Sequence, residues 1–298
     1  MNKFPELINI PLAEGVDNLM DWLLTYLDGF FDVVGFIILK VVMAFEDVFL
    51  FIPWFVIVIL VGLAGWKLIR SLRTGILFMI LMMIIGFFGY WDLAMQTLAL
   101  VISSVVFALL IGLPLGVLMA RNNRAEKILK PILDAMQTMP SFVYLIPALM
   151  FFGMGKVPSM FATIIYAVPP VIRLTNVGIR TVDVEAVEAA KAFGATSRQI
   201  LFDVQLPLAK PSIMVGINQT TMMALSMVVI GSMIGAKGLG MEVLLAIGRI
   251  EVGRGFEAGI SIVFLAIIID RITFSFSEKK DKVEKKPKVE KKAKVEKK

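Results

Sequence analysis

The chain has 298 residues, of which 58% are hydrophobic, and it contains neither cysteine nor histidine. Soluble domains are about 45–50% apolar, so this composition predicts an all-α polytopic membrane protein, and the missing residue types exclude disulfides, thiol catalysis and histidine-based metal or acid–base chemistry. The net charge of +6 is carried entirely by residues 278–298, so it indicates a basic tail and not a nucleic-acid-binding fold.

The N-terminal segment, residues 1–47, carries eight acidic side chains and only two basic ones, Lys3 and Lys40. Over residues 14–34, apolar residues recur every three or four positions, and the aspartates lie off that stripe. This spacing predicts an amphipathic helix. We interpret residues 1–47 as an extracytoplasmic segment whose helix either lies on the outer membrane surface or packs against the bundle as a brace.

Seven segments are apolar enough to cross a bilayer, which takes about 20 residues each. They lie at roughly 48–66, 75–92, 97–119, 138–154, 159–179, 211–235 and 254–272. Basic residues cluster after the first, third, fifth and seventh of them. The positive-inside rule then predicts about seven transmembrane helices, with the N-terminus outside and the C-terminus cytoplasmic.

The segments divide the chain into parts. Residues 48–92 are interpreted as accessory transmembrane helices, and residues 93–275 as the core of the bundle, with a cytoplasmic loop at 181–210. The fifth span contains Arg173 and Asn176, and such polar residues are tolerated in a membrane only where neighbouring helices or a water-filled path satisfy them.

The cytoplasmic loop contains the sequence EAVEAAKAFGATSRQILFDVQLP at residues 185–207. Asp183 is expected to cap a short helix whose alanine-rich face carries Phe193 as a single aromatic plug. Gly194 is expected to end that helix in a left-handed conformation. Thr196 or Ser197 is then positioned to cap a second helix. A small, smooth helix held between two spans suits the transmission of force from a soluble partner.

This loop resembles the EAA loop of ABC-importer permeases, in which the same residues dock into a cleft of a cytoplasmic ATPase subunit. The resemblance rests on Glu188-Ala189-Ala190, then Gly194, then Gln205-Leu206-Pro207. It implies a type I ABC-importer permease fold with residues 93–275 as the permease core. The implied ATPase-docking residues are Glu188, Ala189, Ala190, Gly194 and Pro207.

The sixth span carries polar residues that are candidates for a translocation path, namely Asn218, Gln219, Thr221 and Ser226. Helical spacing places Asn218 and Thr221 on one face and Gln219 and Ser226 on an adjacent one. The alternative is that these side chains form hydrogen bonds between helices and have no part in transport.

The C-terminal segment, residues 276–298, is lysine-rich and includes the hexads DKVEKK, PKVEKK and AKVEKK. It has too few large apolar residues to fold alone, so it is predicted to be a disordered cytoplasmic tail. Lys279, Lys280, Lys285 and Lys286 are candidates for contact with anionic membrane lipids. The alternative is a solvated extension without a function.

The resemblance narrows to the permeases of glycine betaine/proline importers over about residues 95–275, through stretches such as QTMPSFVYLIPALMFFGMGKVP (137–158) and INQTTMMALSMVVIGSMIGAKGLG (217–240). It implies uptake of glycine betaine, proline betaine or proline in osmoprotection, by a multi-pass protein of the bacterial cytoplasmic membrane. The implied partners are two ATPase subunits, an extracytoplasmic substrate-binding protein and a second copy of the permease.

The absence of an ATP-binding motif indicates that the energy for transport comes from another polypeptide. The sequence has no G-x-x-x-x-G-K-[ST], so it is not expected to bind ATP itself or to be an enzyme. The chain is expected to hold no cofactor, with ATP and Mg²⁺ on the partner ATPase. Two alternatives remain: an ABC permease for choline, carnitine or an amino acid, and a secondary osmolyte carrier, which would favour internal repeats and charges at mid-membrane depth.

Overall fold

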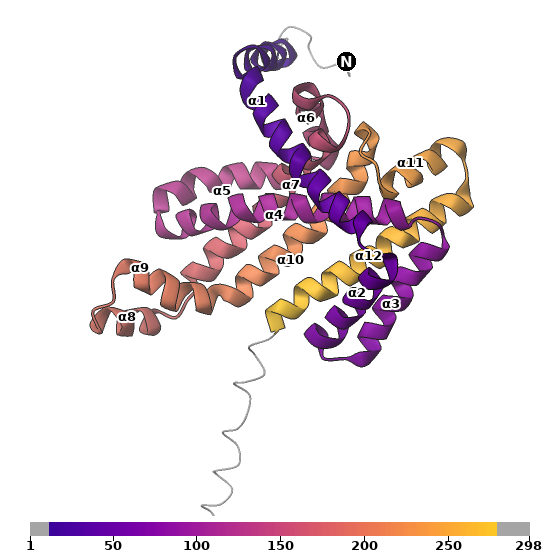
Figure 1. Cartoon of the computed structure of the whole chain (residues 1–298). Coiled ribbons are helices and arrows are strands. Elements are labelled where there is room, and N and C mark those ends of the chain that lie inside the picture. Colours follow the sequence, from indigo (N-terminus) through magenta and orange to yellow (C-terminus); the bar gives the residue numbers. More distant parts are fainter. Residues whose placement is uncertain (1–11, 279–298) are drawn as a thin grey trace, which may run out of the picture.

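The structure, a computed structural model, describes residues 12–278, and every regular element in that range is helical. The all-α prediction is therefore confirmed for the described residues. The elements, labelled in Figure 1, are α1 (Leu12–Phe51), α2 (Trp54–Ile69), α3 (Leu72–Phe87), α4 (Trp91–Arg121), α5 (Asn123–Thr138), η1 (Ser141–Tyr144), α6 (Leu145–Phe152), α7 (Lys156–Arg180), α8 (Val184–Ala192), α9 (Ser197–Gln199), η2 (Ile200–Gln205), α10 (Leu206–Gly231), η3 (Ser232–Ile234), α11 (Leu239–Arg249) and α12 (Val252–Glu278).

The core of the bundle is built around α7, which packs extensively against both α4 and α10. Glycines allow the backbones to approach closely at the first of these interfaces. A Cβ atom at Gly112 would lie 2.4 Å from Cγ1 of Val171, and one at Gly116 would lie 2.6 Å from Cβ of Thr175. Small residues four apart are a common means of packing helices in membranes, where no hydrophobic effect drives helices together.

The described residues contain four to six helical stretches that are long and apolar enough to cross a membrane. Four helical stretches are long and apolar enough alone: Trp91–Arg121, Lys156–Arg180, Ser197–Ile234 and Val252–Phe276. Two sharply bent pairs also qualify, α1 with α2 at 100° and α5 with η1 and α6 at 111°. Helix α3 is apolar but has only 16 residues. A multi-pass membrane architecture is therefore present, although seven straight spans are not.

Three of the predicted spans differ from the structure. The one expected at 75–92 ends with α3 at Phe87, and the other two are broken at prolines. The span expected at 48–66 is interrupted, because α1 ends at Phe51 and α2 begins only after Pro53. The span expected at 138–154 is not one helix: a 3₁₀ turn follows Pro140, and α6 has eight residues, about 12 Å at 1.5 Å per residue. Apolar composition predicted both segments correctly as membrane-like, but the prolines break their helices.

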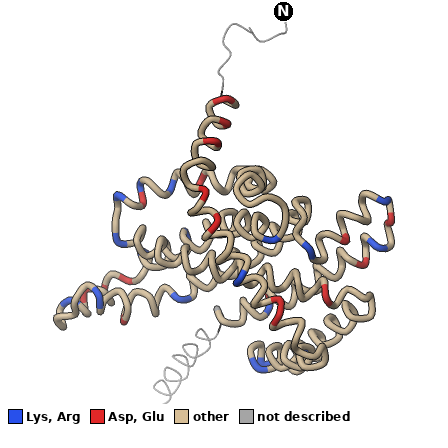
Figure 2. The backbone as a smooth tube through the Cα atoms, turned by 45° about the horizontal axis from the view of Figure 1, so that its top comes forward, with Lys and Arg blue, Asp and Glu red and all other residues tan. Residues whose placement is uncertain are grey.

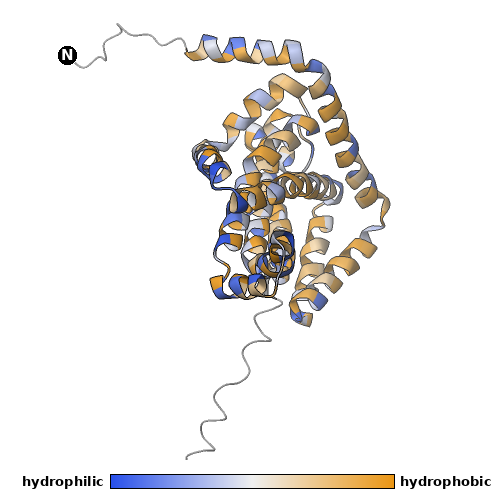
Figure 3. Cartoon of the chain, turned by 90° about the vertical axis from the view of Figure 1, so that its left-hand side faces the viewer, coloured by the Kyte–Doolittle hydropathy of each residue, from blue (hydrophilic) through white to orange (hydrophobic). Residues whose placement is uncertain are grey.

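Helix α1 is a single element of 40 residues, so the amphipathic helix expected at 14–34 is part of a longer one, and the expected boundary at residue 47 falls inside it. Figure 2 shows acidic residues along the part of α1 that extends furthest from the bundle. The remainder contacts the core: the Phe31 ring stacks on Phe151 of α6 with centroids 4.0 Å apart, and Glu46 forms an ion pair with Lys156 at the start of α7. Figure 3 shows that the hydropathy of this helix changes from mixed to strongly apolar along its length.

Candidate functional site

The predicted loop forms a projection at one end of the bundle, between the end of α7 and the start of α10 (Figure 1). Helix α8 begins as expected, because an Asp183 carboxylate oxygen accepts a hydrogen bond from the Glu185 backbone N–H at 3.0 Å. Acidic residues at a helix N-terminus also interact favourably with the helix dipole. The start of α8 is therefore fixed by its own sequence.

The end of α8 is a left-handed glycine turn. Gly194 has φ = +81°, its N–H donates to the Lys191 carbonyl at 2.9 Å, and the Ala195 N–H donates to the Ala190 carbonyl at 3.0 Å. This pair of bonds is a Schellman motif, in which glycine is favoured because it has no Cβ to clash. The expected role of Gly194 as the helix terminator agrees with this geometry.

A capping box then starts the second short helix. The Thr196 hydroxyl accepts from the Gln199 N–H at 3.4 Å, and the Thr196 N–H donates to the Gln199 side-chain oxygen at 2.8 Å. The chain continues through the π-helical segment η2 directly into α10. Leu201 of η2 is buried with Ile179 and Ala209 in a small apolar cluster. The loop is thus joined to both α7 and α10 by packing as well as by the backbone.

The outer surface of the loop carries the predicted docking residues. Glu188, Ala189, Gly194 and Pro207 are exposed, and Ala190 is partly buried. The sequence pattern placed Phe193 as an aromatic plug beside the alanine face, but its side chain is 93% exposed. The ring does not cover the alanine face, so this surface of α8 is open in the single chain.

A polar network at the base of the loop was not predicted from the sequence. The guanidinium of Arg180, the last residue of α7, donates to the Asn176 side-chain oxygen at 2.9 Å and to the Met119 carbonyl at 2.7 Å, and pairs with Glu126 of α5 at 3.0 Å. Two helical turns earlier on α7, Arg173 forms an ion pair with Asp134 of α5. The polar residues of the fifth span were visible in the sequence, but their partners on another helix were not.

The candidate path residues of α10 do not form one cluster. An amide N–H of Asn218 donates to an Asp270 carboxylate oxygen on α12 at 3.0 Å. The hydroxyls of Thr221 and Ser226 donate to backbone carbonyls of their own helix, at Ile217 and Met222. Gln219 and Ser226 are exposed, whereas Thr221 is buried. Asp270, which the sequence analysis did not single out, is the acidic partner within the last span.

Unpaired polar atoms accompany these residues. Among the described residues, the Asn218 side-chain oxygen and the Thr220 hydroxyl are buried without a hydrogen-bond partner. A buried polar atom without a partner is costly in a low-dielectric environment. The middle of α10 therefore contains polar groups that the rest of its own chain leaves unsatisfied, as do α4 at Gln96 and α7 at Ser159, Arg173 and Thr175.

Comparisons with known proteins identify the family of the chain. A family model described as "Binding-protein-dependent transport system inner membrane component" matches residues 112–281. The glycine betaine/carnitine transport permease protein GbuB of Listeria monocytogenes is 50% identical over 278 residues, which cover 92% of this chain and 98% of that protein. The glycine betaine/proline betaine transport system permease protein ProW of Escherichia coli K12 is 48% identical over 264 residues, which cover 89% of this chain and 74% of that protein.

A solved structure of the MetNI methionine ABC transporter in an inward-facing conformation has the same fold in part. It aligns with a TM-score of 0.55 at 24% identity and covers 60% of this chain and 92% of that one. The resemblance found in the sequence is thereby confirmed for the family and for the ABC-importer permease fold.

Proposed function

The chain belongs to the inner membrane components of binding-protein-dependent transport systems, and from that premise we propose that it is the permease subunit of an ATP-driven importer of glycine betaine. The observation that carries this proposal is the exposed α8 surface, held at the ends of α7 and α10 by a Schellman motif, a capping box and a small apolar core. An ordered projection of this kind suits docking to a separate ATPase.

The proposed mechanism is a lever. Closure of the ATPase subunits displaces α8, and because Leu201 packs on Ile179 and Ala209, α7 and α10 are displaced together. The Arg180 network passes the same displacement to α5 through Glu126. The helices are then reoriented as rigid bodies, which is the general form of transport-related switching. Glu188, Ala189, Ala190, Gly194 and Pro207 are the proposed docking residues.

The proposed translocation path follows the exposed stripe of α10. Val215, Gln219 and Ser226 lie along one side of this helix and remain exposed in the single chain. We propose that a second copy of the permease covers this stripe, so that the path runs between the two copies, with Asn218 and Thr221 beside it. Two ATPase subunits and an extracytoplasmic binding protein complete the assembly, and ATP and Mg²⁺ are held by the ATPases.

The proposed substrate rests on what the relatives share. Both named permeases have glycine betaine in their names, paired with carnitine in one and with proline betaine in the other. Glycine betaine is therefore the first substrate to test, for a role in osmoprotection. Carnitine, choline and amino acids are the alternatives within the same class of machine.

The decisive experiment is reconstitution of the full chain with its ATPase and binding protein in proteoliposomes. We expect ATP-dependent uptake of glycine betaine, and stimulation of ATP hydrolysis by that solute above carnitine, choline or proline. Stimulation by another solute would show that the proposed substrate is wrong, but it would still support an ATP-driven importer. Uptake by the permease alone, without ATP, would instead show a secondary carrier.

The proposed orientation has a separate test. We propose seven spans, with the short apolar helix α3 crossing in addition to the six that qualify by length and composition. The distribution of basic residues favours an N-terminus outside and a cytoplasmic C-terminus. Because the chain has no cysteine, a cysteine placed at Asn2 is expected to react with an impermeant reagent outside intact cells, and one added after Lys298 is not. The reverse labelling would place the α8 loop outside and remove the basis for ATPase docking.

A further inference from the structure

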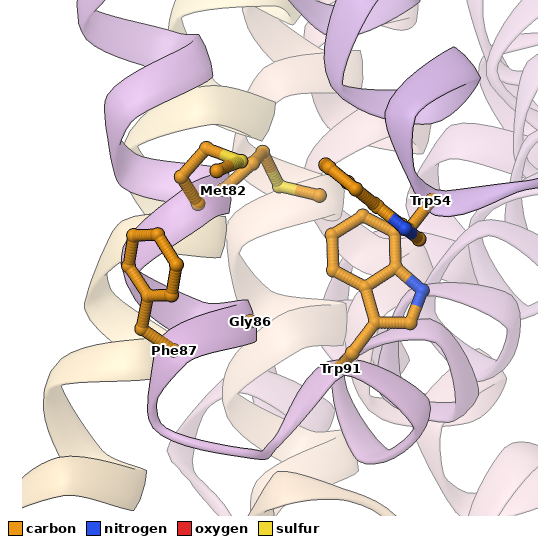
Figure 4. A pocket seen from close by; sticks show the side chains of 6 residues that line it. Trp54, Met82, Gly86, Phe87 and Trp91 are labelled. Carbon is orange, nitrogen blue, oxygen red and sulfur yellow. The ribbon is translucent and has the colours of Figure 1, made fainter.

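A pocket lies at the meeting point of three helix ends, namely the start of α2, the end of α3 and the start of α4. Its volume is about 320 Å³, near the lower end of the range for small-ligand pockets. The lining consists of Trp54, Met82, Met83, Gly86, Phe87 and Trp91, all of them apolar or aromatic. Figure 4 shows the two indoles on one side of the cavity and the Phe87 ring on the other.

The pocket owes its space to Gly86. A Cβ atom at this position would have only one neighbouring atom, Cε3 of Trp91 at 3.8 Å, which is an ordinary contact. The α3 backbone therefore forms part of the wall where most residues would place a side chain. A larger residue would enter the cavity without displacing any helix.

The pocket opens to the surface of the protein, because two of its lining residues, Trp54 and Phe87, are 54% and 78% exposed. Further along α2 and α3, large apolar side chains are also exposed: Ile59, Leu60 and Leu63 on α2, and Ile76, Leu77 and Ile80 on α3. Cationic residues Lys67, Arg70 and Arg73 lie at the opposite end of this helix pair. Sixteen residues of α3 span about 24 Å, less than the roughly 30 Å hydrocarbon core, so the pocket lies within the hydrocarbon near the other interface.

The two indoles also supply hydrogen-bond donors beside the pocket. Within residues 12–278 neither the Trp54 nor the Trp91 indole N–H has a hydrogen-bond partner, and Figure 4 shows both nitrogens on the side of the indoles that faces away from Met82 and Phe87. Tryptophan is enriched at this depth because its ring is apolar and its N–H bonds to the head-group region. The structure thus combines an apolar cavity with two donors at its edge.

We propose that this pocket is a binding site for a membrane phospholipid, with an acyl chain between Met82, Met83 and Gly86 and the two indoles donating to ester or phosphate oxygens. The cavity opens to the bilayer, and left empty it would forfeit the dispersion contacts of its whole lining. Aromatic rings also attract quaternary ammonium groups, but no carboxylate lines this pocket to balance such a charge. An acyl chain therefore fits the lining better than a free cationic solute does.

The proposal is tested by photocrosslinking of the full chain in nanodiscs, with a phosphatidylglycerol that carries a diazirine in the middle of one acyl chain. Mapped by mass spectrometry, crosslinks are expected to concentrate on residues 82–91, above the level on the equally lipid-facing residues 76–80. Gly86→Leu, which fills the cavity, is expected to remove that excess. Gly259→Leu on α12, where a Cβ would meet nothing within 4 Å, is the matched control and should retain it.

A second variant covers the case in which Gly86→Leu does not fold. Met83→Phe closes the pocket from another position on α3 and is expected to remove the same excess, with crosslinks on α12 unchanged as the sign of an intact fold. Crosslinks on 82–91 that equal those on 76–80, or that persist in both filled variants, would overturn the proposal. Saturable displacement of the lipid by glycine betaine or tetramethylammonium would overturn it in favour of a quaternary-ammonium site.

Discussion

The loop at residues 181–210 is ordered by bonds between near neighbours, whereas Asn218 in α10 depends on Asp270, which is 52 residues away. In the loop, the bonds at Asp183, Gly194 and Thr196 each join residues no more than five apart. A substitution in the loop is therefore expected to change the shape of a small exposed element. A substitution in α10 is expected to change how two spans pack.

The largest effect is expected for Gly194→Val. A β-branched residue at φ = +81° costs roughly 1–2 kcal/mol of left-handed strain, so the Schellman turn should open and α8 should move. Because a Cβ at this site would meet no atom within 4 Å, the effect is due to the backbone and not to crowding. Uptake in proteoliposomes and co-purification of the ATPase should both fall sharply, while the protein still inserts.

The matched control is Gly194→Asn, because asparagine adopts the left-handed conformation more readily than valine. It is expected to retain most of the uptake. Normal ATPase association and uptake in Gly194→Val would contradict the coupling role of the loop. Equal losses in both variants would point to a need for glycine at the contact surface itself, where any side chain blocks the partner.

The next largest effect is expected for Phe193→Ala. This side chain is 93% exposed, so its loss should not destabilise the permease, but an aromatic anchor at an interface contributes on the order of 1–2 kcal/mol, or about tenfold in affinity. Binding of the ATPase to detergent-solubilised permease measures this. Phe256→Ala on α12, at a site 69% exposed, is the control, and an equal loss there would show that the effect is not specific to the loop.

A smaller effect is expected for the hydrogen-bonded pair of Asn218 in α10 and Asp270 in α12. Asn218→Ala should lower the unfolding free energy by about 1 kcal/mol, because it removes a hydrogen bond to a carboxylate. With Asp270→Asn as the second change, a double-mutant cycle should show non-additivity of about 0.5–1.5 kcal/mol. Thr221→Val should be milder, since that hydroxyl bonds only to its own helix. Additive changes at Asn218 and Asp270 would show that the hydrogen bond contributes nothing to the free energy of unfolding.

The same contrast explains what could be predicted from the sequence. Asp183 as a cap and Gly194 as a terminator are local signals, and the structure places both as expected. The sequence predicts Phe193 as a plug, but its side chain is exposed, because a sequence does not reveal whether any helix lies opposite an aromatic side chain. The Arg180 and Asp270 contacts join distant helices, so nothing in the local pattern identifies them.

The spans show the same limit at a larger scale. Hydropathy identified the apolar segments, and it is an average over residues that does not register where a helix ends. Pro53 and Pro140 each stand at a break, so 48–66 and 138–154 contain bends that no average would show. The stacking of Phe31 on Phe151 depends on one of these bends, since it brings the short α6 against α1.

The smallest effect is expected from the lysine-rich tail. Its residues 279–298 lie outside the described range, so this prediction rests on charge alone. Each lysine near an anionic bilayer contributes on the order of 1 kcal/mol, and the attraction decays within a Debye length of about 10 Å at 0.1 M salt. Truncation after Ser277 is therefore expected to shift the salt dependence of uptake modestly in vesicles rich in anionic lipid, and not in neutral ones. Replacing Lys279, Lys280, Lys285 and Lys286 with glutamine keeps the length of the tail and should give part of the same shift, because charge and not length is responsible. Superimposable salt curves for the full-length and truncated chains would leave the tail as a solvated extension.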